Sequence, residues 1–154
     1  MENLNLPTYS FKIKYELQRK LIFDSIRKKY VVLTPEEWVR QNFIQYLVGE
    51  KGYPGSLIAV EKKVDVNLLP QRSDIILYNS NAQAVMIVEC KSVKVKITQD
   101  VFNQVARYNM KLRVPFLVVT NGLQHYCCQM DYEKRTFKFI PEIPLYESIK
   151  NYQD

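Results

Sequence analysis

Residues 72–92 read RSDIILYNSNAQAVMIVECKS, and this stretch predicts a β-hairpin. Asp74 opens the run Ile75–Tyr78, whose composition is typical of a strand. Asn79, Ser80 and Asn81 supply turn residues. The apolar run that follows, residues 84–88, predicts a buried central strand.

The end of the second strand carries Glu89, Cys90 and Lys91. Because side chains alternate along a strand, Glu89 and Lys91 should share one face, and the antiparallel partner strand can bring Asp74 to the same edge. Two converging carboxylates suit a hard divalent cation, and a lysine beside them can orient a water or stabilise negative charge. This set matches the needs of metal-assisted phosphodiester hydrolysis. The alternative is a strand that ends in an ordinary surface Glu–Lys pair.

Composition bounds the class of protein. A chain of 154 residues suits one domain with a real core, and a formal charge of +6 favours a polyanionic partner. No long uncharged apolar run and no secretory signal occur, so we expect no membrane span and a cytoplasmic protein. The chain has an odd number of cysteines and no C-x-x-C pair, which argues against a disulfide framework or a zinc site. The three cysteines are Cys90, Cys127 and Cys128.

The order of elements predicts an α/β fold with a mixed sheet flanked by helices. Residues 1–34 form an N-terminal β arm, and Thr34 caps a helix that begins at Pro35, with Glu37 completing a capping box. A second helix, from Thr98 to about Leu112, should return the chain parallel to the strand that ends at Glu89. The remaining expected elements are a strand at 58–64, a polar connection at 65–73, continued alternation at 92–97, strands at 116–120, 125–130 and 137–140, a tight turn at 121–122, and a short helix after residue 144.

Several motifs occur together in one order. They are Thr34-Pro35-Glu36-Glu37-Trp38-Val39-Arg40-Gln41, Gly52-Tyr53-Pro54, Glu89-Cys90-Lys91, Gln104-x-x-x-Tyr108 and Thr120-Asn121-Gly122. The pattern Asp74…Glu89-x-Lys91 resembles that of the PD-(D/E)xK nucleases. As a set, the motifs resemble the N-terminal nuclease domain of type I restriction enzyme R subunits, over roughly residues 20 to 140.

The resemblance implies a restriction-endonuclease-like core at residues 35–140 of a single domain, 1–154, and magnesium-dependent DNA cleavage. By this carry-over, Asp74 and Glu89 would ligate Mg²⁺, with Mn²⁺ as a substitute, and Lys91 would be the catalytic lysine. Glu37 would match a helix glutamate that joins such sites. Its place in the capping box explains it equally well, and Glu36 is the substitute candidate.

DNA contacts are implied at further positions. Gln104 and Tyr108 match a motif that lies beside the active site in these nucleases. Basic residues could hold phosphates or form a plain solvated surface, and these are Arg40, Lys94, Lys96, Arg107 and Lys111.

One departure from the R subunit concerns ATP. The chain lacks a G-x-x-x-x-G-K-[ST] phosphate loop, so we expect a nuclease without the translocase, either stand-alone or part of something longer. DNA and other restriction–modification subunits are the expected partners. Two alternatives stay open, namely a non-catalytic DNA-binding module that keeps the nuclease fold, and an assembly subunit whose charge is incidental.

Overall fold

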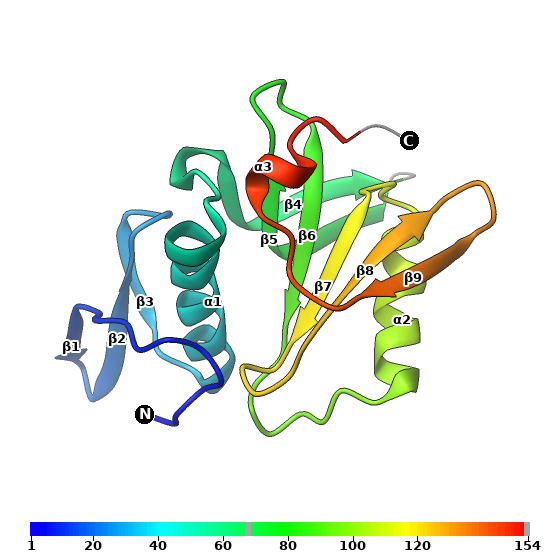
Figure 1. The fold of residues 1–154 in the computed structure, drawn as a ribbon. Coiled ribbons are helices and arrows are strands. Elements are labelled where there is room, and N and C mark those ends of the chain that lie inside the picture. The colour runs from blue at the N-terminus through cyan, green and yellow to red at the C-terminus, as the bar shows by residue number, and fades with distance from the viewer. Residues whose placement is uncertain (67–68, 153–154) are drawn as a thin grey trace.

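A computed structural model of the chain describes residues 1–66 and 69–152, with the side chains of residues 63–72 left aside. It contains two sheets and three α-helices within the described residues (Figure 1). The elements in chain order are β1 (Ile13–Glu16), β2 (Arg19–Asp24), β3 (Lys29–Val32), α1 (Pro35–Lys51), the 3₁₀ turn η1 (Gly55–Leu57), β4 (Ile58–Val66), β5 (Leu69–Tyr78), β6 (Ala84–Cys90), α2 (Gln99–Met110), β7 (Phe116–Thr120), β8 (His125–Asp131), β9 (Thr136–Ile140) and α3 (Tyr146–Ile149).

The larger sheet is mixed, as predicted. Its order is β4-β5-β6-β7-β8-β9, and every neighbouring pair is antiparallel except β6 and β7, which are parallel. A parallel pair needs a crossover connection, and α2 supplies it. The predicted hairpin of residues 72–92 is therefore the centre of the sheet, between β4 and β7.

Helices cover both faces of this sheet. Side chains from α1, such as Val39 and Phe43, pack with Ile75 and Val88 in one buried cluster. On the other face, Phe102 and Ala106 of α2 pack with residues that include Ile76, Ile87 and Leu117. Figure 1 shows the resulting layers, in which the N-terminal sheet, α1, the large sheet and α2 follow one another. This arrangement is the predicted α/β architecture with an N-terminal β arm.

The helix termini follow the predicted chemistry. Thr34 Oγ1 accepts a hydrogen bond from the backbone N–H of Glu37 at 3.0 Å, which starts α1. Gly52, with φ of 74°, ends α1 in a left-handed conformation that glycine adopts without strain. Thr98 caps α2 through the N–H of Val101. The N-cap prediction is therefore confirmed for both helices. The predicted capping box is wrong, because the N–H of Thr34 donates to the carbonyl of Val32 and the Glu37 carboxylate accepts from Arg27, Arg40 and Gln41 instead.

Two sequence predictions of strand boundaries were wrong. β5 begins at Leu69 rather than near Asp74, because residues 69–73 pair with β4 in a long hairpin. Residues 67–68 of the predicted polar connection lie outside the described residues. The segment 92–97 contains no strand, although its side chains alternate in type. Its neighbour β7 ends at Thr120, opposite Cys90, so no strand lies beyond to pair with it.

Candidate active site at the end of the central hairpin

The carboxylates of Asp74 and Glu89 meet where β5 and β6 part. Ile75 lies opposite Val88 in the antiparallel register, and one further step places Asp74 opposite Glu89 on the same face. The backbone N–H of Cys90 donates to Asp74 Oδ2 at 2.8 Å. This bond fixes the aspartate against the end of β6, so the predicted pair of acids shares one edge of the sheet.

Lys91 completes the predicted group. Its Nζ lies 3.5 Å from Glu89 Oε1, and its backbone N–H donates to the carbonyl of Thr120 at 2.8 Å. The Lys91 and Glu89 side chains retain 31% and 27% of their exposure, so both reach solvent. The structure thus brings Asp74, Glu89 and Lys91 together at a solvent-facing edge.

The charge on Glu89 is poorly compensated. Burial, followed by the nearby carboxylate of Asp74, raises the pKa of Glu89 to about 7, and the ammonium of Lys91 only partly offsets this. Burial and Asp74 also raise the pKa of Glu36 on α1. Glu36, Asp74 and Glu89 therefore act on one another as like charges, and we call them the sheet-end acids. A site of this kind has a surplus of negative charge.

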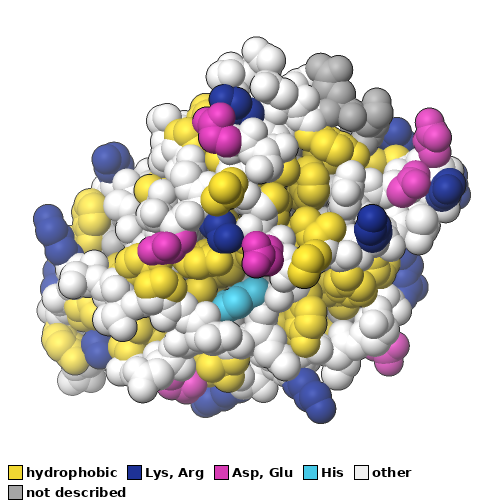
Figure 2. All heavy atoms as spheres, viewed as in Figure 1, with side chains coloured by type: hydrophobic (Ala, Val, Ile, Leu, Met, Phe, Trp, Pro, Cys, Tyr) yellow, Lys and Arg dark blue, Asp and Glu magenta, His cyan; other side chains and the backbone are white. Residues whose placement is uncertain are grey.

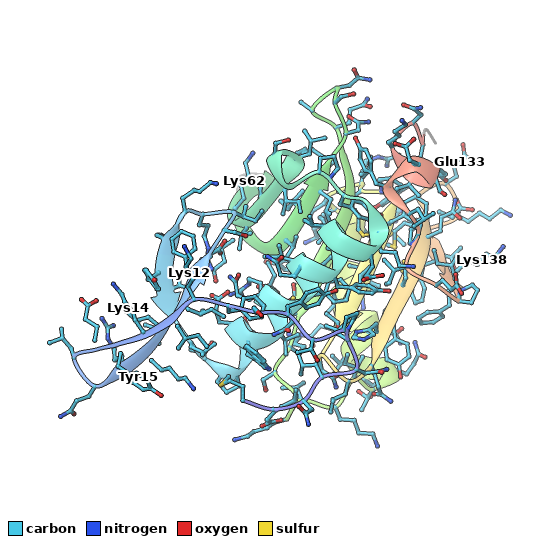
Figure 3. The ribbon with its side chains drawn as sticks, turned by 60° about the vertical axis from the view of Figure 1, so that its left-hand side comes forward. Lys12, Lys14, Tyr15, Lys62, Glu133 and Lys138 are labelled. Carbon is cyan, nitrogen blue, oxygen red and sulfur yellow. The ribbon has the colours of Figure 1, made fainter. Side chains whose placement is uncertain are left out.

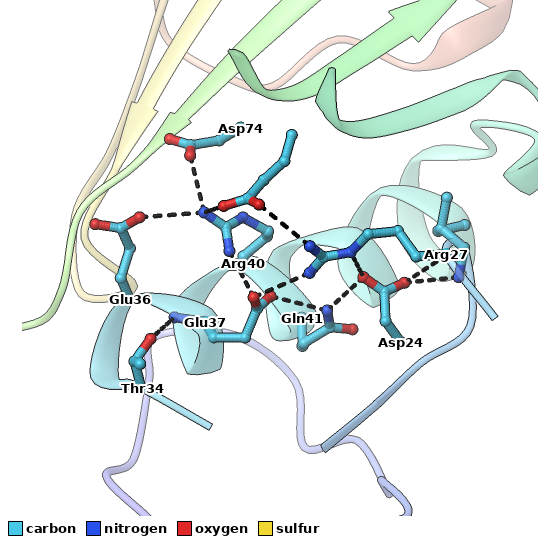
Figure 4. A network of polar contacts seen from close by, with 10 residues as sticks. Asp24, Arg27, Thr34, Glu36, Glu37, Arg40, Gln41 and Asp74 are labelled. Atoms are coloured by element: carbon cyan, nitrogen blue, oxygen red, sulfur yellow. Dashed lines mark hydrogen bonds and ion pairs between the residues drawn. The ribbon is translucent and has the colours of Figure 1, made fainter. Parts of the chain in front are cut away.

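Glu36 and Glu37 are neighbours in sequence but have different surroundings (Figure 4). The Glu37 side chain is 7% exposed, and its carboxylate accepts from Arg27, Arg40 and Gln41. The Glu36 side chain is 48% exposed, and its carboxylate pairs with Arg40 Nη2 at 3.1 Å. Glu37, predicted as a metal ligand, is thus held by cations inside the protein, and Glu36 is the acid that faces the site.

Arg40 is the cation that links the two sets of acids. Its guanidinium is 4% exposed and lies 2.9 Å from Asp74 Oδ1 and 2.7 Å from Glu37 Oε1. Burial opposes its charge, but the hydrogen bond to Asp74 and the charge of Glu37 raise its pKa above the ordinary value. A buried arginine so engaged does not reach a phosphate, so the predicted phosphate contact at Arg40 is replaced by a structural role.

A wider ion-pair network joins the N-terminal sheet to this edge. Glu61, which the sequence prediction missed, lies 3.3 Å from both Arg27 Nη1 and Arg40 Nη2. The sequence placed Glu61 within the strand predicted at 58–64 but did not single it out. Five carboxylates share the two guanidinium groups among the described residues, and they are Asp24, Glu36, Glu37, Glu61 and Asp74.

The donor set fits Mg²⁺. Glu89 Oε2 makes no hydrogen bond to any described residue, and the sheet-end acids offer hard oxygen donors. The described part of the chain contains no arrangement of three or more His, Cys, Asp and Glu side chains that could hold a metal. Mg²⁺ commonly uses only one or two carboxylates and takes its other ligands from water and substrate phosphates. Asp74 and Glu89 meet that requirement.

The remaining predicted DNA contacts lie apart from the sheet-end acids. Gln104, Arg107 and Tyr108 are exposed on α2, and Lys94 is exposed in the loop before it. Within the described residues, no hydrogen bond or ion pair joins them to Asp74, Glu89 or Lys91. Figure 2 shows basic side chains spread beside acidic ones on one face rather than gathered in a patch. The described helices include none with the length and apolarity to cross a bilayer.

Comparisons with known proteins agree with this architecture. A family model described as type I restriction enzyme R protein N terminus matches residues 35–144. A solved fragment of a chain assigned as the HsdR subunit of a type I restriction enzyme from Vibrio vulnificus YJ016 is similar in fold, with a TM-score of 0.53 and 18% identity. The match covers 76% of this chain and 24% of that one. A search of curated proteins found no match. The chain belongs to the family of type I restriction enzyme R protein N-terminal domains.

Proposed function

We propose that this protein is a metal-dependent endonuclease that hydrolyses DNA phosphodiester bonds. The observation that carries the proposal is the convergence of Asp74 and Glu89 at one sheet edge, where burial and Asp74 raise the pKa of Glu89 to about 7 and Lys91 lies 3.5 Å from its carboxylate. Membership of the R-subunit family gives independent support. The proposed metal is Mg²⁺, with Mn²⁺ as a substitute. Asp74 and Glu89 would hold it, and Glu36 takes the place first expected for Glu37.

Each side chain has a defined part in this proposal. The chemistry that Mg²⁺ supplies in such a site is activation of a water and neutralisation of the scissile phosphate. The N–H of Cys90 holds Asp74 in a fixed orientation toward that position. Lys91, beside Glu89, can donate to the attacking water or to a phosphate oxygen as negative charge develops. The described residues place no histidine near these groups, since the single histidine, His125, bonds to Thr120 and Asn5.

The wider context is also a proposal. The HsdR chain is about four times as long as the part that this chain matches, so activities of a whole R subunit are not transferred. We infer DNA as the substrate, and other restriction–modification subunits as partners, from the family alone. Gln104 and Tyr108 are exposed on α2, where they could contact bound DNA.

Cleavage of supercoiled plasmid tests the proposal. Wild-type protein with Mg²⁺ or Mn²⁺ should nick the plasmid, and EDTA should abolish nicking. Lys91→Ala should lower the rate by about 100-fold or more, because it removes a charge that acts on the reacting phosphate. Lys134→Ala is the matched control, since Lys134 is an exposed lysine on the β8–β9 turn.

The outcomes separate the rival functions. Equal nicking by wild type and Lys91→Ala would contradict the proposed role of this lysine. Absence of cleavage by the wild type, together with DNA binding that is indifferent to divalent metal, would favour a binding module. DNA binding that is undetectable at low salt would favour an assembly subunit, because phosphate contacts always strengthen at low salt.

A further inference from the structure

The positive charge of the chain is concentrated in the N-terminal sheet. Residues 11–32 contain seven lysines and arginines against two acidic residues, a net charge of +5 out of +6 for the whole chain. This segment lies outside residues 35–144, the part that the family model matches. The basic character that first pointed to a polyanionic partner therefore comes from a sheet that the family match does not cover.

The strand register gathers basic and aromatic side chains on one face of this sheet. Lys14 pairs with Leu21 and Glu16 pairs with Arg19, and the N–H of Phe23 donates to the carbonyl of Lys12. Phe23 in turn pairs with Tyr30. Since paired residues point to the same side, one face carries a set that we call the basic face, namely Lys12, Lys14, Arg19, Phe23 and Tyr30.

Aromatic rings hold the lysines of the basic face in place. Lys14 Nζ lies 4.2 Å from the centroid of the Tyr30 ring, and Lys12 Nζ lies 5.7 Å from that of Phe23. The two rings pack edge to face at 5.2 Å. Lysines cover these rings, so the rings are not open platforms for bases. The surface instead presents the ammonium groups of Lys12 and Lys14, whose Cα atoms are about 7 Å apart along the strand, of the order of the separation of neighbouring phosphates.

A groove separates the basic face from the start of α1. It has a volume of about 610 Å³ and runs between the sheet and the start of α1. Cations and acids both line it, with Lys14, Arg19 and Tyr30 on the sheet and Glu36 and Arg40 on α1. The other charged residues of the lining are Glu16, Arg27, Glu37 and Glu61. Arg40 also bonds to Asp74, so α1 connects this groove to the candidate active site. Figure 3 shows Lys12, Lys14 and Tyr15 on the projecting sheet, at the opposite end of the molecule from Glu133 and Lys138.

We propose that the basic face binds the phosphate backbone of duplex DNA and guides it along the groove toward the sheet-end acids. This inference rests on the proposed function, which supplies DNA as the polyanion. Charge complementarity supports it, because the sheet-end acids repel phosphate in the absence of metal, and a nearby cationic surface would offset that repulsion. Glu16, 3.2 Å from Lys14 Nζ, is the one acidic side chain on the strands of this face.

Fluorescence anisotropy of a labelled duplex of about 20 base pairs, in EDTA, tests this surface without any need for cleavage. A variant with Lys12→Gln, Lys14→Gln and Arg19→Gln should bind at least about tenfold more weakly near 0.1 M salt, and its salt slope should fall by roughly 2–3. All three side chains are exposed. The control carries Lys134→Gln, Arg135→Gln and Lys138→Gln, three exposed cations at the β8–β9 end. It should stay within about threefold of wild type.

The binding measurements test the proposed DNA surface independently of any cleavage activity. Selective loss of binding in the first variant supports it, provided that both variants unfold at the wild-type temperature. Equal loss in both variants, or no binding by the wild type, overturns it. Plasmid cleavage judges the endonuclease proposal independently. If wild-type protein cleaves and the basic-face variant cleaves at the same rate at all DNA concentrations, the basic face is not the DNA path.

Discussion

Glu36 and Glu37 stand side by side on α1, yet they belong to two regions that use acidic residues in opposite ways. Glu37 lies in a buried network in which Asp24, Arg27, Arg40 and Gln41 satisfy one another. Glu36 faces the sheet-end acids, where carboxylates repel one another and raise the pKa of Glu89. In the first region, cations and amides lie at hydrogen-bond distance from the acids. In the second, Arg40 pairs with Glu36 and Asp74, but the cation nearest to Glu89 among the described side chains is Lys91 at 3.5 Å.

The difference indicates what each region does. Burial opposes the ionisation of Asp24, but hydrogen bonds from Arg27 and Gln41 outweigh it and lower the pKa of Asp24. Such an acid stabilises the fold because it is charged and partnered. Glu89 carries a free-energy cost when charged, and that cost falls only if a further cation arrives. The buried network therefore holds the N-terminal sheet on α1, and the sheet-end acids are available for a ligand.

The largest expected effect is loss of the buried network. Asp24→Ala should lower the free energy of unfolding by about 3 kcal/mol, because it removes a buried acceptor that Arg27 and Gln41 share and leaves them with Glu37 and Glu61. Urea denaturation measures this change. Glu36→Ala is the matched comparison and should stay within about 0.5 kcal/mol of wild type, since its side chain is half exposed. Similar losses of unfolding free energy in both variants would contradict the proposed difference between the two regions.

The next prediction concerns Glu89→Gln, which should raise the free energy of unfolding rather than lower it. The pKa of Glu89 is raised from 4.5 to about 7, so the unfolded chain releases this proton more readily than the native state does. Native stability should therefore fall as pH rises from about 4.5 to 7, and Glu89→Gln should remove that loss. In EDTA at pH 8 the variant should be more stable than wild type by on the order of 1–3 kcal/mol.

Urea denaturation at several pH values checks this second prediction. The advantage of Glu89→Gln should shrink toward pH 5, where the native carboxyl of the wild type is protonated. Saturating Mn²⁺ should stabilise the wild type but not the variant, because a ligand stabilises only the state that binds it. A variant that is less stable than wild type at pH 8 would show that Glu89 is well compensated after all.

The smallest effect separates the two adjacent glutamates. Glu36→Gln should weaken Mn²⁺ binding by about tenfold, as loss of a supporting carboxylate near a metal typically does. Glu37→Gln removes the same charge but should leave Mn²⁺ affinity within about threefold, because its carboxylate faces Arg27 and Arg40. Calorimetric titration at a temperature where both variants are folded compares them. A stronger effect at Glu37 would restore the original prediction of its role.

Much of the fold could be predicted from the sequence because the local preferences of the chain agree with its tertiary packing. Thr34 and Thr98 cap the helices that they were predicted to cap, and the crossover helix returns the chain parallel to β6. The N-terminal β arm was also confirmed, because β1, β2 and β3 form a sheet within residues 1–34. The start of β5 was missed because its polar residues owe their strand conformation to pairing with β4, which the sequence of that segment does not reveal.

The site was predicted less completely than the fold. Asp74, Glu89 and Lys91 converge because alternation along adjacent strands is a local rule. Glu36 and Glu37 have different roles because Arg27 pairs with Glu37. Arg27 comes from the turn between β2 and β3, so its position depends on tertiary packing. Arg40 had the appearance of a surface cation in the sequence, and only the packing of α1 against β5 makes it a buried partner of Asp74.

The central claim is that Asp74 and Glu89 hold a divalent cation, and crystals soaked in Mn²⁺ test it most directly. Anomalous scattering should place one Mn²⁺ at about 2 Å from carboxylate oxygens of both Asp74 and Glu89. The peak should disappear in Glu89→Gln crystals. Absence of a peak between these two residues in wild-type crystals, with Mn²⁺ bound elsewhere, would contradict the account.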